Sequence, residues 1–392
     1  MINALDNYEG QHDMSRLLHS DPTQASSPLF TTTLSLPDCN ADAWVVVDST
    51  VNGLAMGGTR MTATVDPTEL GALARAMTHK LALADLPIGG AKAGICPRGP
   101  IGDRDALMRT FGQVARPLMQ GGVYLGCDQG TNQADRDTFF AAAGYDIARV
   151  PGATRLNVEW SDFYRNMSDI TGFGVATAAL ATLEAQGVRT PQRIVLQGFG
   201  AVGRAAALHL VAAGHQVVAV ADVLGTIEDP AGLPVQTLIE CTDTDGTIDR
   251  GRLPSSVRVH DGDRAWLKVG ADLLVLAANA DAVDESAVSS VRAGIVVEGG
   301  NMSISRPARR LLREAGHIVL PDVVVNVGGA ALTGRIITGI TPSGLTAPKL
   351  SAWLRDWISR KIKRNCALIQ ELSDSGSPDP VADLLADRNI AL

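Results

Sequence analysis

Short runs of apolar residues alternate with longer segments of helical spacing along most of the chain. Near-continuous Val, Ile and Leu runs of about five residues are typical of parallel strands that are covered on both faces. We expect strands at residues 43–48, 122–125, 193–197, 216–221, 272–276, 294–297 and 317–320. This alternation predicts an α/β protein with a parallel sheet in its second half.

The segments between these runs have the spacing of helices. The pattern predicts helices over 67–81, 105–119, 171–186, 201–213, 350–372 and 380–390. The helix that begins at Thr171 has small and apolar residues on most of its faces and ends at Gly187, so we expect it to be mostly buried. Residues 226–263, rich in Pro, Gly and Asp, are predicted to form loop and short helix.

Composition excludes several classes of protein. A length of 392 residues predicts two or three domains. The balance of 34 Lys and Arg against 42 Asp and Glu, a net charge of -8, argues against nucleic acid or an anionic membrane as a partner. The first 18 residues contain acids and no apolar run, and no stretch is long and apolar enough to span a membrane, so we expect a cytoplasmic protein. The five cysteines form no CxxC pair, so no metal site is predicted.

The segment RIVLQGFGAVGRAAALHL contains a dinucleotide fingerprint, GxGxxG, made of Gly198, Gly200 and Gly203. It follows a predicted strand and opens a predicted helix, as this motif requires if backbone and helix N-terminus are to meet a pyrophosphate. The loop also contains Ala201 and Val202, which we expect beside the cofactor.

Asp222 ends the next predicted strand, 19 residues after Gly203, where an acid can accept hydrogen bonds from the adenosine ribose. Its charge would repel a 2'-phosphate, and Val223, Leu224 and Gly225 offer no cation to bind one. The sequence therefore predicts NAD as the cofactor in preference to NADP.

Two lysines and an aspartate stand out in glycine-rich surroundings. Lys80 lies at a predicted helix end, Lys92 in a segment that we interpret as a glycine-rich turn, and Asp128 after a strand. Lysines in a mostly apolar stretch are costly to bury unless an anion or a catalytic role retains them. A second lysine close to the first and partly removed from water is a candidate base near neutral pH.

These segments together resemble the glutamate/leucine/phenylalanine/valine dehydrogenase family of amino acid dehydrogenases. The resemblance runs from about Val51 to Thr333 in consistent order, with a weaker similarity in the last helix. The motifs that carry it are GGTRM, MTxK, GGAK, the D-x-GT turn at Asp128, TGFGV, the fingerprint, VEGGN and NVGGA. Several spaced motifs in order are more specific than any one of them.

The resemblance implies roles for the three charged residues. Lys80 would bind the substrate α-carboxylate, Lys92 would activate water, and Asp128 would move protons to and from the substrate nitrogen. The reaction implied is oxidative deamination of an amino acid to a 2-oxo acid and ammonia. Gly57 and Gly58 are expected to let the backbone approach the substrate closely.

The resemblance also implies the architecture, which is α/β with two domains. We expect a substrate-binding and oligomerisation domain made of residues 1–167 and 345–392, and a doubly wound Rossmann NAD domain made of residues 168–344. Further cofactor contacts are expected at Thr171, Ala277, Asn301 and Asn326, of which the two asparagines could instead contact substrate or cap a turn. Members of the family are homo-oligomers.

The residues inferred to face the substrate side chain are Met56, Gly126, Ala330 and Thr333. Glutamate-specific members have a lysine where this chain has Met56, so a second substrate carboxylate would face a thioether. Gly126 and Ala330 are small, which favours a bulky apolar or aromatic side chain, whereas the Thr333 hydroxyl favours a polar one. Leucine-, valine- or glutamate-type activity stays open as an alternative.

Departures from the family pattern keep two other hypotheses open. Ala93, Cys127 and Gln129 replace the usual residues beside Lys92 and Asp128, which suggests a biosynthetic enzyme with an unusual amino acid substrate. A regulatory protein that binds NAD without catalysis would keep the fingerprint, although retention of all three charged residues argues for an enzyme.

Overall fold

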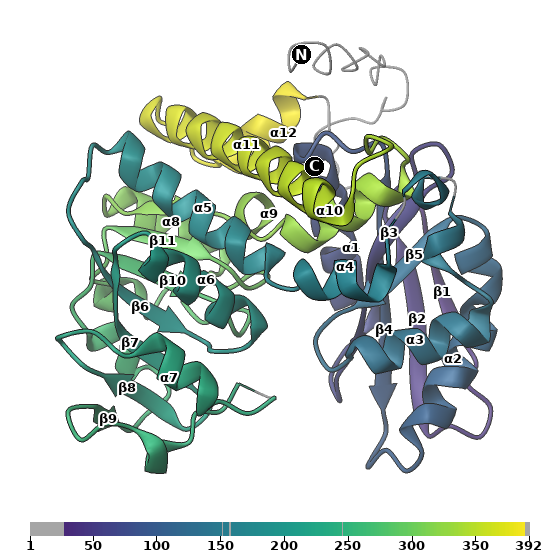
Figure 1. Ribbon diagram of the computed structural model, residues 1–392, viewed down its shortest axis with the longest axis horizontal. Coiled ribbons are helices and arrows are strands. Elements are labelled where there is room, and N and C mark those ends of the chain that lie inside the picture. The colour runs from purple at the N-terminus through teal and green to yellow at the C-terminus, as the bar shows by residue number, and fades with distance from the viewer. Residues whose placement is uncertain (1–26, 151, 157, 245, 389–392) are drawn as a thin grey trace.

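The computed structural model describes residues 27–150, 152–156, 158–244 and 246–388. They form two lobes, each built around its own sheet, with a long helix lying across both (Figure 1). The predicted two-domain α/β architecture is therefore confirmed. The exact domain boundaries stay predictions, and the part of the last predicted helix beyond residue 388 lies outside the described residues, as do residues 1–26.

The first lobe contains a five-stranded sheet of order β1-β2-β4-β3-β5. Its strands are β1 (Phe30–Leu34), β2 (Ala41–Val47), β3 (Ala55–Met61), β4 (Gly89–Pro97) and β5 (Val123–Cys127). β3 runs parallel to both β4 and β5, whereas β2 is antiparallel to β1 and β4. The three parallel strands β3, β4 and β5 therefore bring their corresponding ends to one edge of the sheet.

Helices cover both faces of this sheet because its central strands are apolar on both sides. Val45 and Val47 of β2 belong to the main core, whereas Val46 between them packs against Leu70 and Ala74 of the first helix. The helices of this lobe are α1 (Pro67–Leu83), α2 (Arg104–Gln120), α3 (Gln133–Ala143) and α4 (Trp160–Asn166). Each of α1, α2 and α3 has an Asp or Asn at its N-cap that accepts a backbone hydrogen bond.

The second lobe contains a seven-stranded sheet of order β12-β11-β10-β6-β7-β8-β9. Its strands are β6 (Arg193–Gln197), β7 (Gln216–Asp222), β8 (Gly225–Glu228), β9 (Arg258–His260), β10 (Leu273–Leu276), β11 (Ile295–Glu298) and β12 (Ile318–Leu320). The five strands predicted in this region are present and parallel. The prediction of only loop and short helix over 226–263 is wrong, because β8 and β9 extend the sheet in antiparallel fashion.

Helices cover this second sheet as in other doubly wound folds. The predicted buried helix is α5, which begins at Ile170 and ends at Ala185, and Gly187 follows it with a φ of 70°. The helices of the second lobe are α5 (Ile170–Ala185), α6 (Ala201–Ala212), α7 (Val235–Glu240), α8 (Arg306–Glu314), α9 (Asp322–Val325) and α10 (Gly328–Ile337). α10 also packs against α1, so it leads the chain back to the first lobe.

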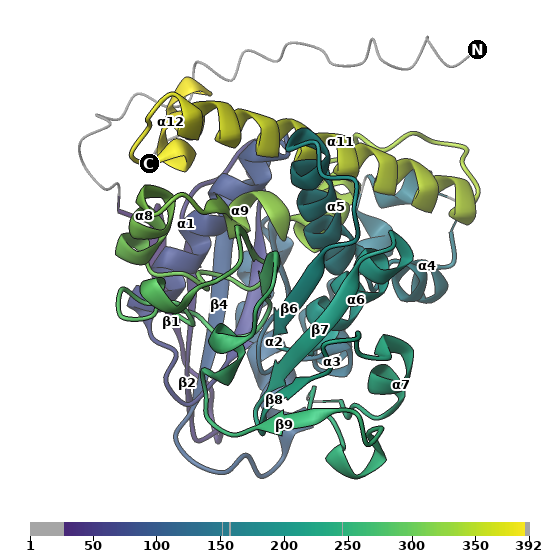
Figure 2. The same ribbon diagram turned by 90° about the vertical axis from the view of Figure 1, so that its left-hand side faces the viewer.

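The chain ends in two helices, α11 (Ala347–Asp374) and α12 (Pro380–Asp387). The long helix α11 lies across both lobes, as Figures 1 and 2 show in two views. On α11, Arg355 forms an ion pair with Asp169 of the second lobe at 2.5 Å, and Lys361 forms one with Asp85 of the first lobe at 2.8 Å. Helix α11 therefore contacts the first lobe, as expected. Its ion pairs also join the first lobe to the second. No helix among the described residues is long and apolar enough to cross a membrane.

Candidate active site

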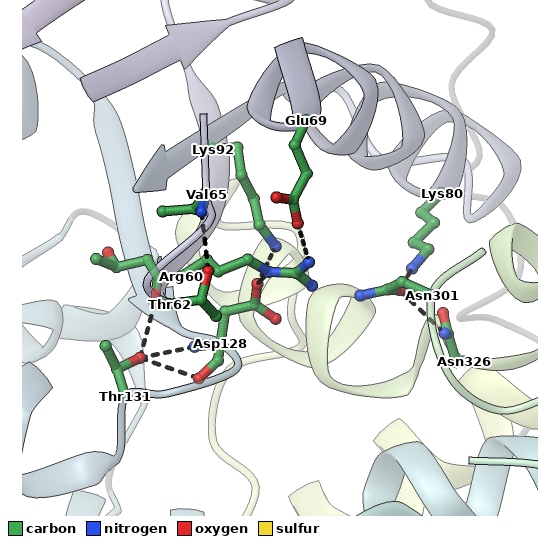
Figure 3. Close-up of polar contacts among 11 residues, drawn as sticks. Arg60, Thr62, Val65, Glu69, Lys80, Lys92, Asp128, Thr131, Asn301 and Asn326 are labelled. Carbon is green, nitrogen blue, oxygen red and sulfur yellow. Dashed lines mark hydrogen bonds and ion pairs between the residues drawn. The ribbon is translucent and has the colours of Figure 1, made fainter. Parts of the chain in front are cut away.

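Lys92 and Asp128 come together where β4 and β5 lie on either side of β3. Lys92 projects from the middle of β4, so its predicted place in a turn is wrong, and Asp128 directly follows β5. Lys92 Nζ lies 2.8 Å from Asp128 Oδ2, and both side chains are largely buried (Figure 3). Burial alone would raise the pKa of Asp128, but the charges of Lys92 and Arg60 and their hydrogen bonds hold it well below its usual range.

Arg60 is a site residue that the sequence analysis did not single out. It lies in the GGTRM motif on β3, donates from Nε to Asp128 Oδ2 at 3.0 Å, and is also paired with Glu69 of α1. Every residue of this strand is buried, and an arginine in a buried strand needs an anionic partner. That requirement was the one signal in the sequence that could have identified Arg60.

The turn after β5 fixes the position of Asp128. Thr131 accepts a hydrogen bond from the Asp128 backbone nitrogen at 2.9 Å and donates one to the Thr59 carbonyl of β3 at 2.7 Å. Gly130 has a φ of 78°, and a Cβ there would lie 1.8 Å from the Met61 carbonyl oxygen. The D-x-GT motif is therefore a turn that holds the aspartate against the parallel strands.

Lys80 faces this group from the last turn of α1 and reaches the second lobe. Its Nζ donates to Asn301 Oδ1 at 2.5 Å, and the same oxygen accepts from Asn326 Nδ2 at 3.2 Å (Figure 3). Burial lowers the pKa of Lys80, and the nearby Lys92 lowers it further, against the opposing charge of Asp322. Both asparagines lie with Lys80, at the point where the two lobes meet.

The two glycines of the GGTRM motif lie where β3 packs closely against its neighbouring strands. A Cβ on Gly57 would lie 1.7 Å from the Ala91 carbonyl oxygen, and one on Gly58 would lie 2.7 Å from the Cys127 carbonyl oxygen. The neighbouring strands therefore occupy the space that side chains at these two positions would need. The glycines therefore allow β3 to pack closely against its neighbours, and contact of their backbone with substrate stays a prediction.

The fingerprint adopts the geometry that its glycines require. Gly198 has a φ of 98°, and a Cβ on Gly203 would lie 2.2 Å from the Gly198 carbonyl oxygen. A Cβ on Gly200 would meet nothing within 4 Å, so that side of the loop has space for a ligand, whereas a Cβ on Gly246 would lie 3.1 Å from the Gly200 nitrogen. Ala201 and Val202 form the first turn of α6, whose N-terminus is suited to a pyrophosphate. These residues fit a dinucleotide.

The other predicted cofactor residues lie around this loop and the lobe interface. Ala277 follows β10, and its carbonyl group packs against Gly198. Thr171 Oγ1 accepts a hydrogen bond from the Gly329 nitrogen at 3.2 Å. Asn326 Nδ2 donates to the Gly299 carbonyl at 3.1 Å, while its Oδ1 is buried without a hydrogen-bond partner among the described residues. An unpaired buried acceptor of this kind fits a ligand with N–H groups, such as a nicotinamide amide.

Asp222 ends β7 as predicted, but its carboxylate is already occupied. Arg250 donates to Oδ2 and Oδ1 at 2.5 and 2.6 Å, and the backbone nitrogens of Ile248 and Leu224 donate at 2.8 and 2.9 Å. Val223, Leu224 and Gly225 provide no cation, as expected, but Arg250, 28 positions away in the chain, places one beside Asp222.

The residues predicted to face the substrate side chain lie in one place. Met56 and Tyr124 are paired across β3 and β5, and a Cβ on Gly126 would lie 3.1 Å from the Tyr124 ring. The Thr333 hydroxyl of α10 lies beside the hydroxyls of Tyr124 and Tyr164, and Ala330 is one turn before it. The Tyr124 ring therefore lies beside the space left by Gly126, and the role of Gly126 in a substrate pocket stays a prediction.

Comparison with family models identifies both lobes. Residues 165–335 match the model for Glutamate/Leucine/Phenylalanine/Valine dehydrogenase, and residues 35–142 match that for the Glu/Leu/Phe/Val dehydrogenase dimerisation domain. The two matches correspond to the fingerprint lobe and to the lobe that contains Lys80, Lys92 and Asp128.

Individual relatives and solved structures agree with these family matches. The chain is 30% identical over 297 residues to the mitochondrial glutamate dehydrogenase of Dictyostelium discoideum, covering 71% of this chain and 58% of that one. It is 30% identical over 301 residues to glutamate dehydrogenase A2 of Halobacterium salinarum, covering 74% and 71%. The structure is similar to the hetero-hexameric glutamate dehydrogenase of Thermus thermophilus in its leucine-bound form, with a TM-score of 0.76, 25% identity, and coverage of 92% and 89%.

Proposed function

The chain belongs to the Glu/Leu/Phe/Val dehydrogenase family of amino acid dehydrogenases, and on that basis we propose that it catalyses the NAD-dependent oxidative deamination of an L-amino acid. The observation that carries the proposal is the contact of Lys92 with Asp128, with Lys80 facing them from α1. Oxidative deamination requires a fixed cation for the substrate carboxylate and a pair of groups that transfer protons, both beside a dinucleotide loop.

Each charged residue has one task in the proposed reaction. Lys80 binds the substrate α-carboxylate, with Asn301 holding its ammonium group in place. A dinucleotide held at the fingerprint loop would supply the acceptor for the hydride that leaves the substrate Cα, and loss of this hydride converts the amine to an iminium. Lys92 takes a proton from the water that attacks this carbon, and Asp128 carries protons to and from the nitrogen. The C–N bond then breaks, and the products are a 2-oxo acid, ammonia and the reduced dinucleotide.

The proposed substrate has a bulky apolar or aromatic side chain. Met56 supports this, because its buried thioether provides no cation for a second carboxylate. The rings of Tyr124 and Tyr164 add apolar surface, and the Thr333 hydroxyl lies beside theirs. The competing assignment is glutamate, which is the substrate named for the relatives and for which the half-buried guanidinium of Arg136, above the Tyr164 ring, is a candidate cation.

The family also suggests the assembly. Its N-terminal model is a dimerisation domain, and the similar Thermus thermophilus protein is a hetero-hexamer. We propose that this chain forms a homo-oligomer through its first lobe.

The proposal is tested by NADH absorbance with a panel of Phe, Trp, Leu, Val and Glu, followed by reductive amination with the matching 2-oxo acids and ammonia. We expect the highest turnover with an aromatic or large apolar substrate. Lys92→Ala should abolish turnover and leave NADH binding intact. Near-normal turnover of Lys92→Ala would refute the catalytic assignment, highest turnover with Glu would refute the side-chain assignment, and NADH binding without turnover on any substrate would favour a regulatory protein.

A further inference from the structure

The adenosine end of the predicted cofactor site contains a buried ion pair, Asp222 with Arg250. The side chain of Asp222 is 2% exposed and that of Arg250 is 19% exposed. A carboxylate offers about four lone-pair positions. The Asp222 carboxylate accepts four hydrogen bonds, from both Nη atoms of Arg250 and from the backbone nitrogens of Ile248 and Leu224.

The arginine is held as firmly as the aspartate. Besides Asp222, Nη1 donates to the Ile248 carbonyl at 2.9 Å and Nη2 approaches the Gly225 carbonyl at 3.3 Å. Gly225 is part of the tight connection between β7 and β8, with a φ of 122°. The pair therefore fixes the segment after α7 to the end of β7, which is a structural use of both side chains.

This arrangement changes the electrostatics on which cofactor selectivity depends. An acid at the end of this strand normally accepts hydrogen bonds from the ribose and repels a 2'-phosphate. Here its charge is neutralised by Arg250 at a distance of 2.5 Å.

We propose that Arg250 is a specificity-determining residue that masks the Asp222 carboxylate, so that the protein binds NADP as well as NAD. The proposal rests on the dinucleotide-binding function proposed above. It does not require substrate turnover, because masking affects only the binding of the adenosine end.

The test is a fluorescence titration of NADH and NADPH against the full-length protein and three variants. In the wild type we expect the two dissociation constants to agree within about tenfold. Arg250→Gln exposes the carboxylate, so the NADPH constant should rise at least about tenfold relative to that for NADH. Arg252→Gln removes the same charge from the same short helix without touching Asp222, and should leave the ratio unchanged.

Asp222→Asn provides an independent readout in case Arg250→Gln does not fold. Because the carboxylate is not available to the ribose, this variant should bind NADH within about threefold of the wild type. A loss of NADH affinity of more than about tenfold in Asp222→Asn would overturn the proposal. So would an undetectable affinity of the wild type for NADPH, or an unchanged ratio in folded Arg250→Gln. If the wild type binds neither dinucleotide, the proposed function fails together with this inference.

Discussion

Two buried carboxylates, Asp128 and Asp222, lie at opposite ends of the proposed site and are both held by arginine. Among the described residues, Arg250 is the one cationic side chain within ion-pair distance of Asp222. Asp128 is paired with Arg60 and also with Lys92, at 3.0 and 2.8 Å. The two sites therefore share an ion pair but differ in whether a lysine takes part.

In the proposed function, that difference separates a proton-transferring site from a static one. Arginine stays protonated under all ordinary conditions, whereas a buried lysine can release its proton. In the proposed reaction the Lys92 and Asp128 pair transfers protons, while the Asp222 and Arg250 pair only holds charge and shape. The side chains of both sites are largely buried, so the type of cation is the main difference between them.

The largest expected effect distinguishes the two acids directly. Asp128→Asn keeps the shape of the side chain but removes its proton acceptor, so kcat should fall about 10²- to 10⁴-fold. Asp222→Asn should leave kcat within about threefold, because no proton passes through it. Steady-state kinetics with the best substrate and thermal unfolding of both variants provide the measurement. Equal losses of kcat in two folded variants would contradict the comparison.

The second prediction concerns Lys80, the cation that must stay charged. Lys80→Gln should raise the amino acid KM by about tenfold to a hundredfold, since a charged hydrogen bond to the substrate is lost. Burial lowers the pKa of Lys80 from its ordinary value of 10.5, so its ammonium is lost at a lower pH than in an exposed lysine. We expect kcat/KM to fall on the alkaline side below that value in the wild type. The same limb should be missing from the pH profile of Lys80→Gln.

The smallest expected effect concerns Arg60. This guanidinium helps to hold the pKa of Asp128 low, so Arg60→Gln should raise that pKa towards its usual value. The acid limb of the kcat/KM profile should then move to higher pH, with a loss of less than about tenfold in kcat at neutral pH. Arg98→Gln is the matched control, because Arg98 is paired with Asp42 on the surface. An acid limb that does not move would show that Arg60 only stabilises β3.

Local pattern was sufficient for most of the second lobe and less so for the first. The parallel strands near the fingerprint are uniformly apolar and were predicted to within a residue or two. β3 and β4 were missed because their glycines, such as Gly57 and Gly89, are typical of turns. Their extended conformation depends on neighbouring strands that occupy the space of the missing side chains.

The sequence by itself predicted the α/β order of elements, the dinucleotide loop and the candidate site residues Lys80, Lys92 and Asp128, because these depend on short-range pattern and on spaced motifs. The tertiary structure alone decided their partners. Arg60 meets Asp128 across 68 positions, Lys80 meets Asn301 across 221, and Arg250 meets Asp222 across 28. Periodicity encodes which residues are buried, but the free energy of a buried charge is set by whichever groups the fold brings beside it.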